Sequence, residues 1–148
     1  MENKWHKKVR EKTIDYLEKE GYEYRSSHVK TGILPLYYRE VSRSTMTSDV
    51  DIIALEHNKI KYIIEIQSST RPKDIIGIIG AINISTIHAY EKIIYPLKDI
   101  VLYIITKPII KGSKRKEQTK MIKERFQLTN GCLNDYKICT ENEFQIIQ

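Results

Sequence analysis

Cysteine is scarce in this chain, and its scarcity excludes a class of folds. Among 148 residues there are two cysteines, Cys132 and Cys139, and no Cys-x-x-Cys pair. Two thiols are too few for a disulfide framework, and their spacing does not match a zinc ribbon. Both are expected to be ordinary thiols in the reducing cytoplasm.

Long apolar runs and several catalytic motifs are also missing. The longest uncharged run, residues 75–90, is shorter than the roughly 18 apolar residues of a membrane-spanning helix, and polar side chains interrupt it. Residues 1–10 are charged and lack the apolar stretch of a signal peptide. Neither a glycine-rich phosphate loop nor a nucleophile elbow occurs, and the four histidines show no metal-ligand spacing. These absences predict a cytoplasmic protein with no membrane contact.

Positive charge, by contrast, is in excess. The chain has 25 Lys and Arg residues against 19 Asp and Glu residues, a formal net charge of +6. This excess favours an anionic partner. The length of the chain suits a single domain over residues 1–148.

Hydrophobic periodicity predicts the order α, β, β, β, α, β, α, β, which indicates a mixed sheet with helices on its faces. A first helix should begin near Trp5 and end before Gly21, and irregular structure should fill 26–47, with room for one strand around 36–41. A second helix is expected over 72–92, and the basic segment 111–126 should be helical after Gly112. The other strands are expected over 22–24, 49–55, 60–67, 100–106 and 136–139.

Two carboxylates stand out within the paired apolar strands. Asp51 is followed by Ile-Ile-Ala, and Glu65 lies between isoleucines. Acidic residues are poor strand formers and costly inside a sheet, so a lone glutamate here is unusual. A hairpin would bring Asp51 and Glu65 to the same end of the sheet, and strand alternation puts Glu65 and Gln67 on one face. With the Ile66 carbonyl, the two carboxylates would form a hard oxygen site for Mg²⁺.

This arrangement resembles the core of the PD-(D/E)xK nucleases, the restriction-endonuclease-like superfamily. The shared features are an Asp followed by two apolar residues, a hairpin, an apolar-Glu-x-Gln motif and a following helix, and they span most of the chain. The resemblance implies an α/β fold with a mixed sheet flanked by helices in the order αβββαβ. It also implies a Mg²⁺-dependent deoxyribonuclease, in which Mn²⁺ can substitute. Carried over residue by residue, Asp51 and Glu65 bind the metal, and Gln67 takes the place of a lysine that positions or helps activate the attacking water.

Two positions depart from the superfamily pattern. Val50 stands where its proline would be, a variation that the superfamily tolerates. Gln67 replaces the usual lysine, and an amide can orient water but can neither take a proton nor supply charge. Certain type II restriction enzymes resemble this chain in carrying glutamine there, so a small type II restriction endonuclease is the first expectation. A Holliday junction resolvase and a catalytically inactive nucleic-acid-binding module with the same fold are the alternatives.

Residues outside the motif are assigned from their position in the chain. Asp49 is expected in a turn rather than at the metal, and Glu11 projects away from the apolar face of the first helix. Basic side chains before the motif, after it and in the 111–126 segment are candidates for contact with DNA phosphates. They are Lys30, Arg39, Arg43, Arg71, Lys73, Lys114, Arg115 and Lys116. A solvated helix face is the alternative explanation for the basic segment.

The expected helix over 72–92 carries isoleucines around most of its circumference. A helix that is apolar nearly all round must be covered on more than one side, and so small a domain has little material beyond its sheet. We therefore expect a homodimer that buries this helix at its interface, with Gly77 and Gly80 permitting close approach. Two sites related by a twofold axis would suit double-strand cleavage of a symmetric sequence.

Overall fold

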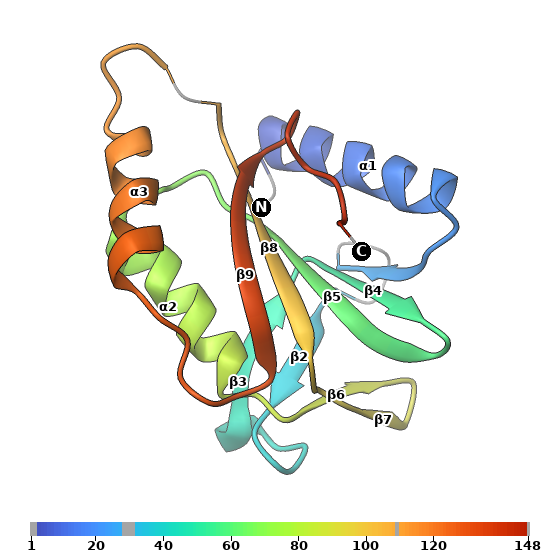
Figure 1. Ribbon diagram of the computed structural model, residues 1–148. Coiled ribbons are helices and arrows are strands. Elements are labelled where there is room, and N and C mark those ends of the chain that lie inside the picture. The colour runs from blue at the N-terminus through green and yellow to red at the C-terminus, as the bar shows by residue number, and fades with distance from the viewer. Residues whose placement is uncertain (1–2, 28–31, 109, 148) are drawn as a thin grey trace.

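Residues 3–27, 32–108 and 110–147 are described by a computed structural model, and they form a mixed α/β fold (Figure 1). Lys30, one of the predicted DNA contacts, lies outside the described residues. The helices are α1 (Lys4–Lys19), α2 (Pro72–Asn83) and α3 (Arg115–Arg125), with a short 3₁₀ turn, η1 (Arg43–Thr45). The strands are β1 (Glu23–Ser26), β2 (Leu34–Tyr37), β3 (Met46–Val50), β4 (Ile52–Glu56), β5 (Lys59–Ile66), β6 (Ile87–Tyr90), β7 (Ile93–Pro96), β8 (Ile100–Thr106) and β9 (Leu133–Thr140).

A five-stranded mixed sheet forms the centre of the fold, in the order β1-β4-β5-β8-β9. β4 and β5 form the expected antiparallel hairpin, and β5, β8 and β9 run parallel to one another. α1 lies on one face of this sheet, while α2 and α3 lie on the other (Figure 1). Each face is buried by its own apolar cluster, one including Val9 and Leu17 of α1 and the other Ile75, Ile79 and Ile82 of α2.

A second, antiparallel sheet has the order β3-β2-β6-β7. The chain leaves this sheet at Val50, the last residue of β3, and enters the central sheet at Ile52, the first of β4. Asp51 is therefore the single residue between the two sheets. The strand predicted over 49–55 is interrupted at this residue, and Asp49 lies in β3 rather than in a turn as expected.

The predicted helix over 72–92 is wrong in its second half. α2 ends at Asn83, and residues 87–96 form the β6–β7 hairpin instead. The buried Asn83 side chain holds the helix end to the chain before β9, since its Oδ1 accepts from the Leu133 N–H at 3.0 Å. The hairpin turns at Glu91 and Lys92, both with positive φ, as a two-residue turn between twisted strands requires. Continuous apolar character concealed the change from helical to strand periodicity.

The other boundaries differ less. α1 ends before Gly21, whose φ of +79° suits the expected helix stop. β2 begins and ends earlier than the strand proposed around 36–41, and β9 is longer than the predicted 136–139. α3 begins at Arg115, after Gly112 as expected, because Gly112 at a φ of +85° and the residues beside it form a turn.

The surroundings of α2 change the premise of the homodimer. α3 packs along α2 (Figure 1), so one side of the helix faces the sheet and another faces α3. Ile84 and Ile87, counted as helix residues in the sequence, lie beyond its end. Covering the apolar surface of α2 therefore does not require a second copy of the chain, and dimerisation stays a prediction. No helix in the described ranges has the length and apolar character needed to cross a membrane.

Candidate active site

Asp51 and Glu65 meet at one end of the central sheet. The Asp51 N–H donates to Glu65 Oε1 at 2.7 Å, and the Ile66 N–H donates to Asp51 Oδ2 at 2.8 Å. Each carboxylate is thus held by a backbone N–H: that of Asp51 holds Glu65, and that of Ile66, the residue after Glu65, holds Asp51. The junction between β3 and β4 places Asp51, and the last residues of β5 place Glu65 and Ile66. The structure brings together the two carboxylates that the hairpin pattern paired.

The two carboxylates make the site electrostatically unfavourable in the absence of a cation. Burial raises the pKa of Glu65 well above its ordinary value, and the Asp51 carboxylate raises it further. The hydrogen bond from the Asp51 N–H lowers this pKa, and the charge of Asp49 raises it. A proton or a bound cation would relieve this repulsion.

A residue that the sequence did not single out also reaches the pair. His6, in the first turn of α1, lies with its Nε2 3.4 Å from Asp51 Oδ1, and both side chains are largely buried, at 19% and 16% exposure. Val9 and Thr13, which lie three and seven positions after His6, are both buried. That helical spacing would have placed His6 beside the face that packs on the sheet. It could not have revealed which strand residue lies opposite.

Gln67 follows β5 directly. Its N–H donates to the Ile105 carbonyl at 2.9 Å, which continues the pairing of β5 with β8. Its half-buried side chain makes no hydrogen bond to another described residue, so the amide is available to a ligand. Glu65 and Gln67 keep the two-residue spacing that places both side chains on the same side of the strand.

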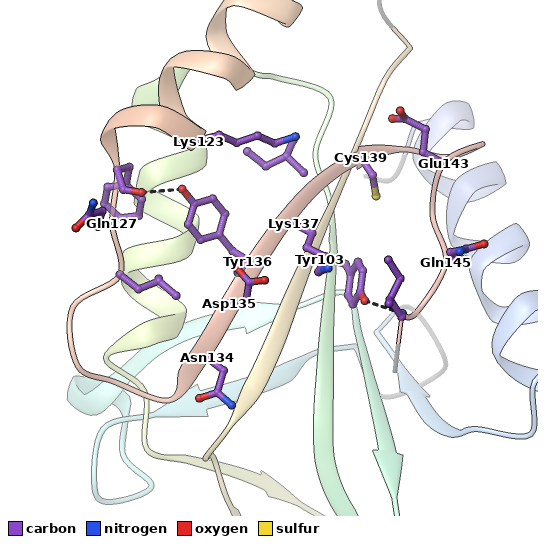
Figure 2. Close-up of a pocket in the computed structure, with 14 residues that line it drawn as sticks. Tyr103, Lys123, Gln127, Asn134, Asp135, Tyr136, Lys137, Cys139, Glu143 and Gln145 are labelled. Carbon is purple, nitrogen blue, oxygen red and sulfur yellow. Dashed lines mark hydrogen bonds between the residues drawn. The ribbon is translucent and has the colours of Figure 1, made fainter.

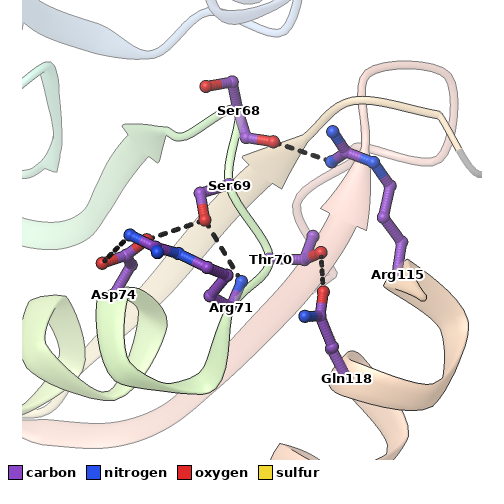
Figure 3. A network of polar contacts seen from close by, with 7 residues as sticks. All are labelled: Ser68, Ser69, Thr70, Arg71, Asp74, Arg115 and Gln118. Carbon is purple, nitrogen blue, oxygen red and sulfur yellow. Dashed lines mark hydrogen bonds and ion pairs between the residues drawn. The ribbon is translucent and has the colours of Figure 1, made fainter. Parts of the chain in front are cut away.

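The segment after Gln67 is fixed by a polar network (Figure 3). The Arg115 guanidinium donates to the Ser68 carbonyl at 2.7 Å, and the Thr70 hydroxyl donates to Gln118 of α3 at 2.6 Å. Ser69 donates to Asp74 at 2.7 Å, and Arg71 pairs with the same carboxylate at 3.0 Å. Arg71 and Arg115, both predicted as DNA contacts, therefore take part in holding this turn and α3 behind the motif.

The other predicted DNA contacts are spread over the surface. Arg39 and Arg43 lie beyond the far end of β3, whose five residues put its two ends roughly 15 Å apart. This distance removes them from the immediate surroundings of Asp51. Lys114 pairs with Glu117 at 3.7 Å. Lys73 and Lys116 are exposed near the starts of α2 and α3.

A large cavity lies along the outer edge of β9, two strands away from β5 (Figure 2). It encloses about 650 Å³ between α3 and the C-terminal segment, and Asp135, Tyr136 and Glu143 are among its lining residues. Two of its polar side chains already have partners, since Tyr136 donates to the Phe126 carbonyl at 2.8 Å and Glu143 accepts from the Thr140 N–H at 2.8 Å. We take Asp51 and Glu65 as the candidate site because their charges are unbalanced.

The residues at this site suit a magnesium ion, which needs few protein ligands, better than a metal whose ligands all come from the protein. Over the described ranges, no three His, Cys, Asp or Glu side chains form a ready-made metal site. Mg²⁺ is often bound through one or two carboxylates, with water and substrate phosphate completing its shell. Asp51, Glu65 and the Ile66 carbonyl match that minimal set. A closed structural site for zinc would require more side-chain ligands than the pair supplies.

Comparison of the chain with protein-family models, curated proteins and solved structures gives no significant match. The likeness to PD-(D/E)xK nucleases consequently rests on the motif residues and on the order of elements around them.

Proposed function

We propose that this protein is a metal-dependent DNA endonuclease that hydrolyses phosphodiester bonds at Asp51 and Glu65. The observation that carries the proposal is that these two carboxylates lie together at the end of a hairpin, where Glu65 accepts from the Asp51 N–H and Asp51 accepts from the Ile66 N–H. The raised pKa of Glu65 supports it, because burial and then the Asp51 carboxylate disfavour the charged form of Glu65, and a divalent cation would stabilise that form. The excess positive charge of the chain suits a polyanionic substrate.

Each residue of the site has a distinct role in this proposal. Asp51, Glu65 and the Ile66 carbonyl would hold Mg²⁺, or Mn²⁺ in its place. The bound ion would stabilise charge on the phosphate and lower the pKa of a coordinated water. Gln67 orients the attacking water through its amide but takes no proton from it. His6 keeps Asp51 in position from the opposite side, 3.4 Å away.

Within this class we favour a small type II restriction endonuclease. Glutamine at position 67 supports this choice over a Holliday junction resolvase, which usually carries lysine there. A twofold dimer would let two such sites cut both strands of a symmetric sequence. A catalytically inactive DNA-binding module is the other candidate, and the missing lysine is the feature that favours it.

Plasmid cleavage tests the proposal. Purified protein is incubated with supercoiled plasmid or a four-way junction, in Mg²⁺ or Mn²⁺. We expect cleavage that Asp51→Asn lowers by at least about 100-fold, since loss of a group behind a metal ligand already costs about 10- to 100-fold. Asp15→Asn, which changes an exposed carboxylate nine residues after His6 in α1, is the matched control and should keep cleavage.

The substrate that is cut distinguishes the candidates. Discrete plasmid fragments would support a site-specific endonuclease, and cutting of the junction alone would support the resolvase. DNA binding with no cleavage of either substrate would support the inactive module. Equal cleavage by the wild type and by Asp51→Asn would contradict the assignment of the site.

A further inference from the structure

The first turns of α1 lie beside the candidate site. His6 contacts Asp51, and the Lys107 ammonium lies 5.5 Å from the centre of the Trp5 ring. Lys107 follows β8, the strand next to β5, so these two contacts hold the start of the helix over the end of the sheet that carries the carboxylates. Figure 1 shows α1 beginning next to the upper end of β8.

This part of α1 is basic and has no acidic residue. Residues 4–10 read Lys-Trp-His-Lys-Lys-Val-Arg, and the first acidic residue of the helix is Glu11. Lys4, Lys7 and Lys8 are exposed, and none of their ammonium groups has an ion-pair or hydrogen-bond partner among the described residues. Three ammonium groups therefore face solvent within a few residues of His6.

The position of these lysines is unfavourable for the helix itself. The start of a helix carries the positive end of its dipole, so cations there destabilise it and acidic residues are preferred. A sequence selected only for helix stability would have the opposite charge in this turn. A local rule broken next to a candidate site indicates that the charge serves the site.

α3, the basic helix that the sequence favoured for DNA contact, uses several of its charges internally. Lys114 pairs with Glu117, and Lys120 pairs with Glu124 at 3.9 Å. Arg115 holds the Ser68 carbonyl. Lys116, Lys123 and Arg125 of α3 have no ion pair within the described residues, so both helices carry unpaired positive charge, but α1 is the one that contacts Asp51, through His6.

We infer that Lys4, Lys7 and Lys8 of α1 bind the phosphate backbone of double-stranded DNA next to the candidate metal site. This inference rests on the proposed function, because it takes DNA as the substrate. Exposed lysines bind phosphate as point charges and do not read the base sequence. The α1 surface therefore supplies affinity for the phosphate backbone, while sequence recognition is left to other residues.

The salt dependence of DNA binding tests the inference. Binding of a short fluorescent duplex is measured by anisotropy in EDTA, across a range of salt concentrations, for the wild type and for Lys4→Gln/Lys7→Gln/Lys8→Gln. Each phosphate contact contributes about 0.9 to the slope of log affinity against log salt. We expect the slope of the triple variant to fall by up to about 2.7.

A variant of α3 with the same charge change is the control. Lys120→Gln/Lys123→Gln/Arg125→Gln removes three exposed cations and should leave the slope close to that of the wild type. An equal or larger loss of slope in this control overturns the inference, while cleavage dependent on Asp51 would still support the nuclease. A wild type that binds no duplex at low salt overturns both. Circular dichroism of each variant checks that the helices are intact.

Discussion

Two histidines of this chain contact residues far away in the sequence. His6 Nε2 lies 3.4 Å from Asp51 Oδ1, because α1 packs on the central sheet. His88 is buried, and its Nδ1 lies 2.7 Å from the Pro35 carbonyl oxygen. Neither contact follows from spacing in the sequence, whereas Asp51 and Glu65 were predictable because a carboxylate inside an apolar strand is rare and a hairpin defines which residues meet.

His88 makes stability depend on pH. Burial lowers its pKa from 6.5 to about 4, and the charge of Arg25 adds to this effect, although the hydrogen bond to the Pro35 carbonyl opposes it. A lowered pKa means that the folded state holds the neutral ring. Its contribution to stability is present above pH 6.5 and is lost as the pH falls towards 4. The difference between these two pKa values corresponds to about 3 kcal/mol of unfolding free energy.

Denaturant unfolding at several pH values measures this contribution. His88→Gln keeps an amide donor for the Pro35 carbonyl but does not titrate. We expect the wild type to lose stability relative to the variant between pH 6.5 and 4. A constant difference between the two proteins across that range would contradict the assignment of the titration to His88.

Among the elements, the 72–92 segment shows why an apolar run misleads. Its isoleucines satisfy both a buried helix and a buried strand, and periodicity alone does not separate the two. The turn residues Glu91 and Lys92 adopt positive φ without being glycine or asparagine, so the hairpin carried no turn signal. The β4–β5 hairpin was recognisable because a polar turn separates two β-branched runs.

β9 is an edge strand whose exposed backbone is partly protected. Asp135 accepts from the outward Tyr136 N–H at 2.8 Å, and Glu143 accepts from the outward Thr140 N–H at 2.8 Å. Acidic side chains on edge amides block the addition of another strand. At the large cavity beside β9, these two carboxylates therefore hinder pairing of a further strand with the backbone of β9.

Removing both acids should expose this edge. We expect Asp135→Ala/Glu143→Ala to associate into larger species than the wild type at equal concentration, as measured by sedimentation velocity. Asp15→Ala/Glu18→Ala on the exposed side of α1 makes the same charge change away from the edge and should leave the size distribution unchanged. Identical sedimentation of the edge variant and the wild type would show that the two carboxylates do not protect β9.

At the scale of the whole molecule, the candidate site residues lie at one end of the central sheet. The ends of β5 and β8, the start of α1 and the turn before α2 all meet there, and α3 holds that turn through Arg115 and Gln118. The sequence predicted the class of fold and the order of most elements. It could not predict the second sheet, because that sheet pairs β2 with strands from both sides of the motif.

The central claim is that Asp51 and Glu65 hold a divalent cation, and Mn²⁺ binding measured by calorimetry tests it most directly. We expect the wild type and Asp15→Asn, which removes an exposed carboxylate of α1, to bind Mn²⁺ with similar affinity. Asp51→Asn should weaken binding by at least about 10-fold, the lower limit for groups that only support a metal ligand. Mn²⁺ binding that is absent from the wild type, or unchanged by Asp51→Asn, would contradict the account.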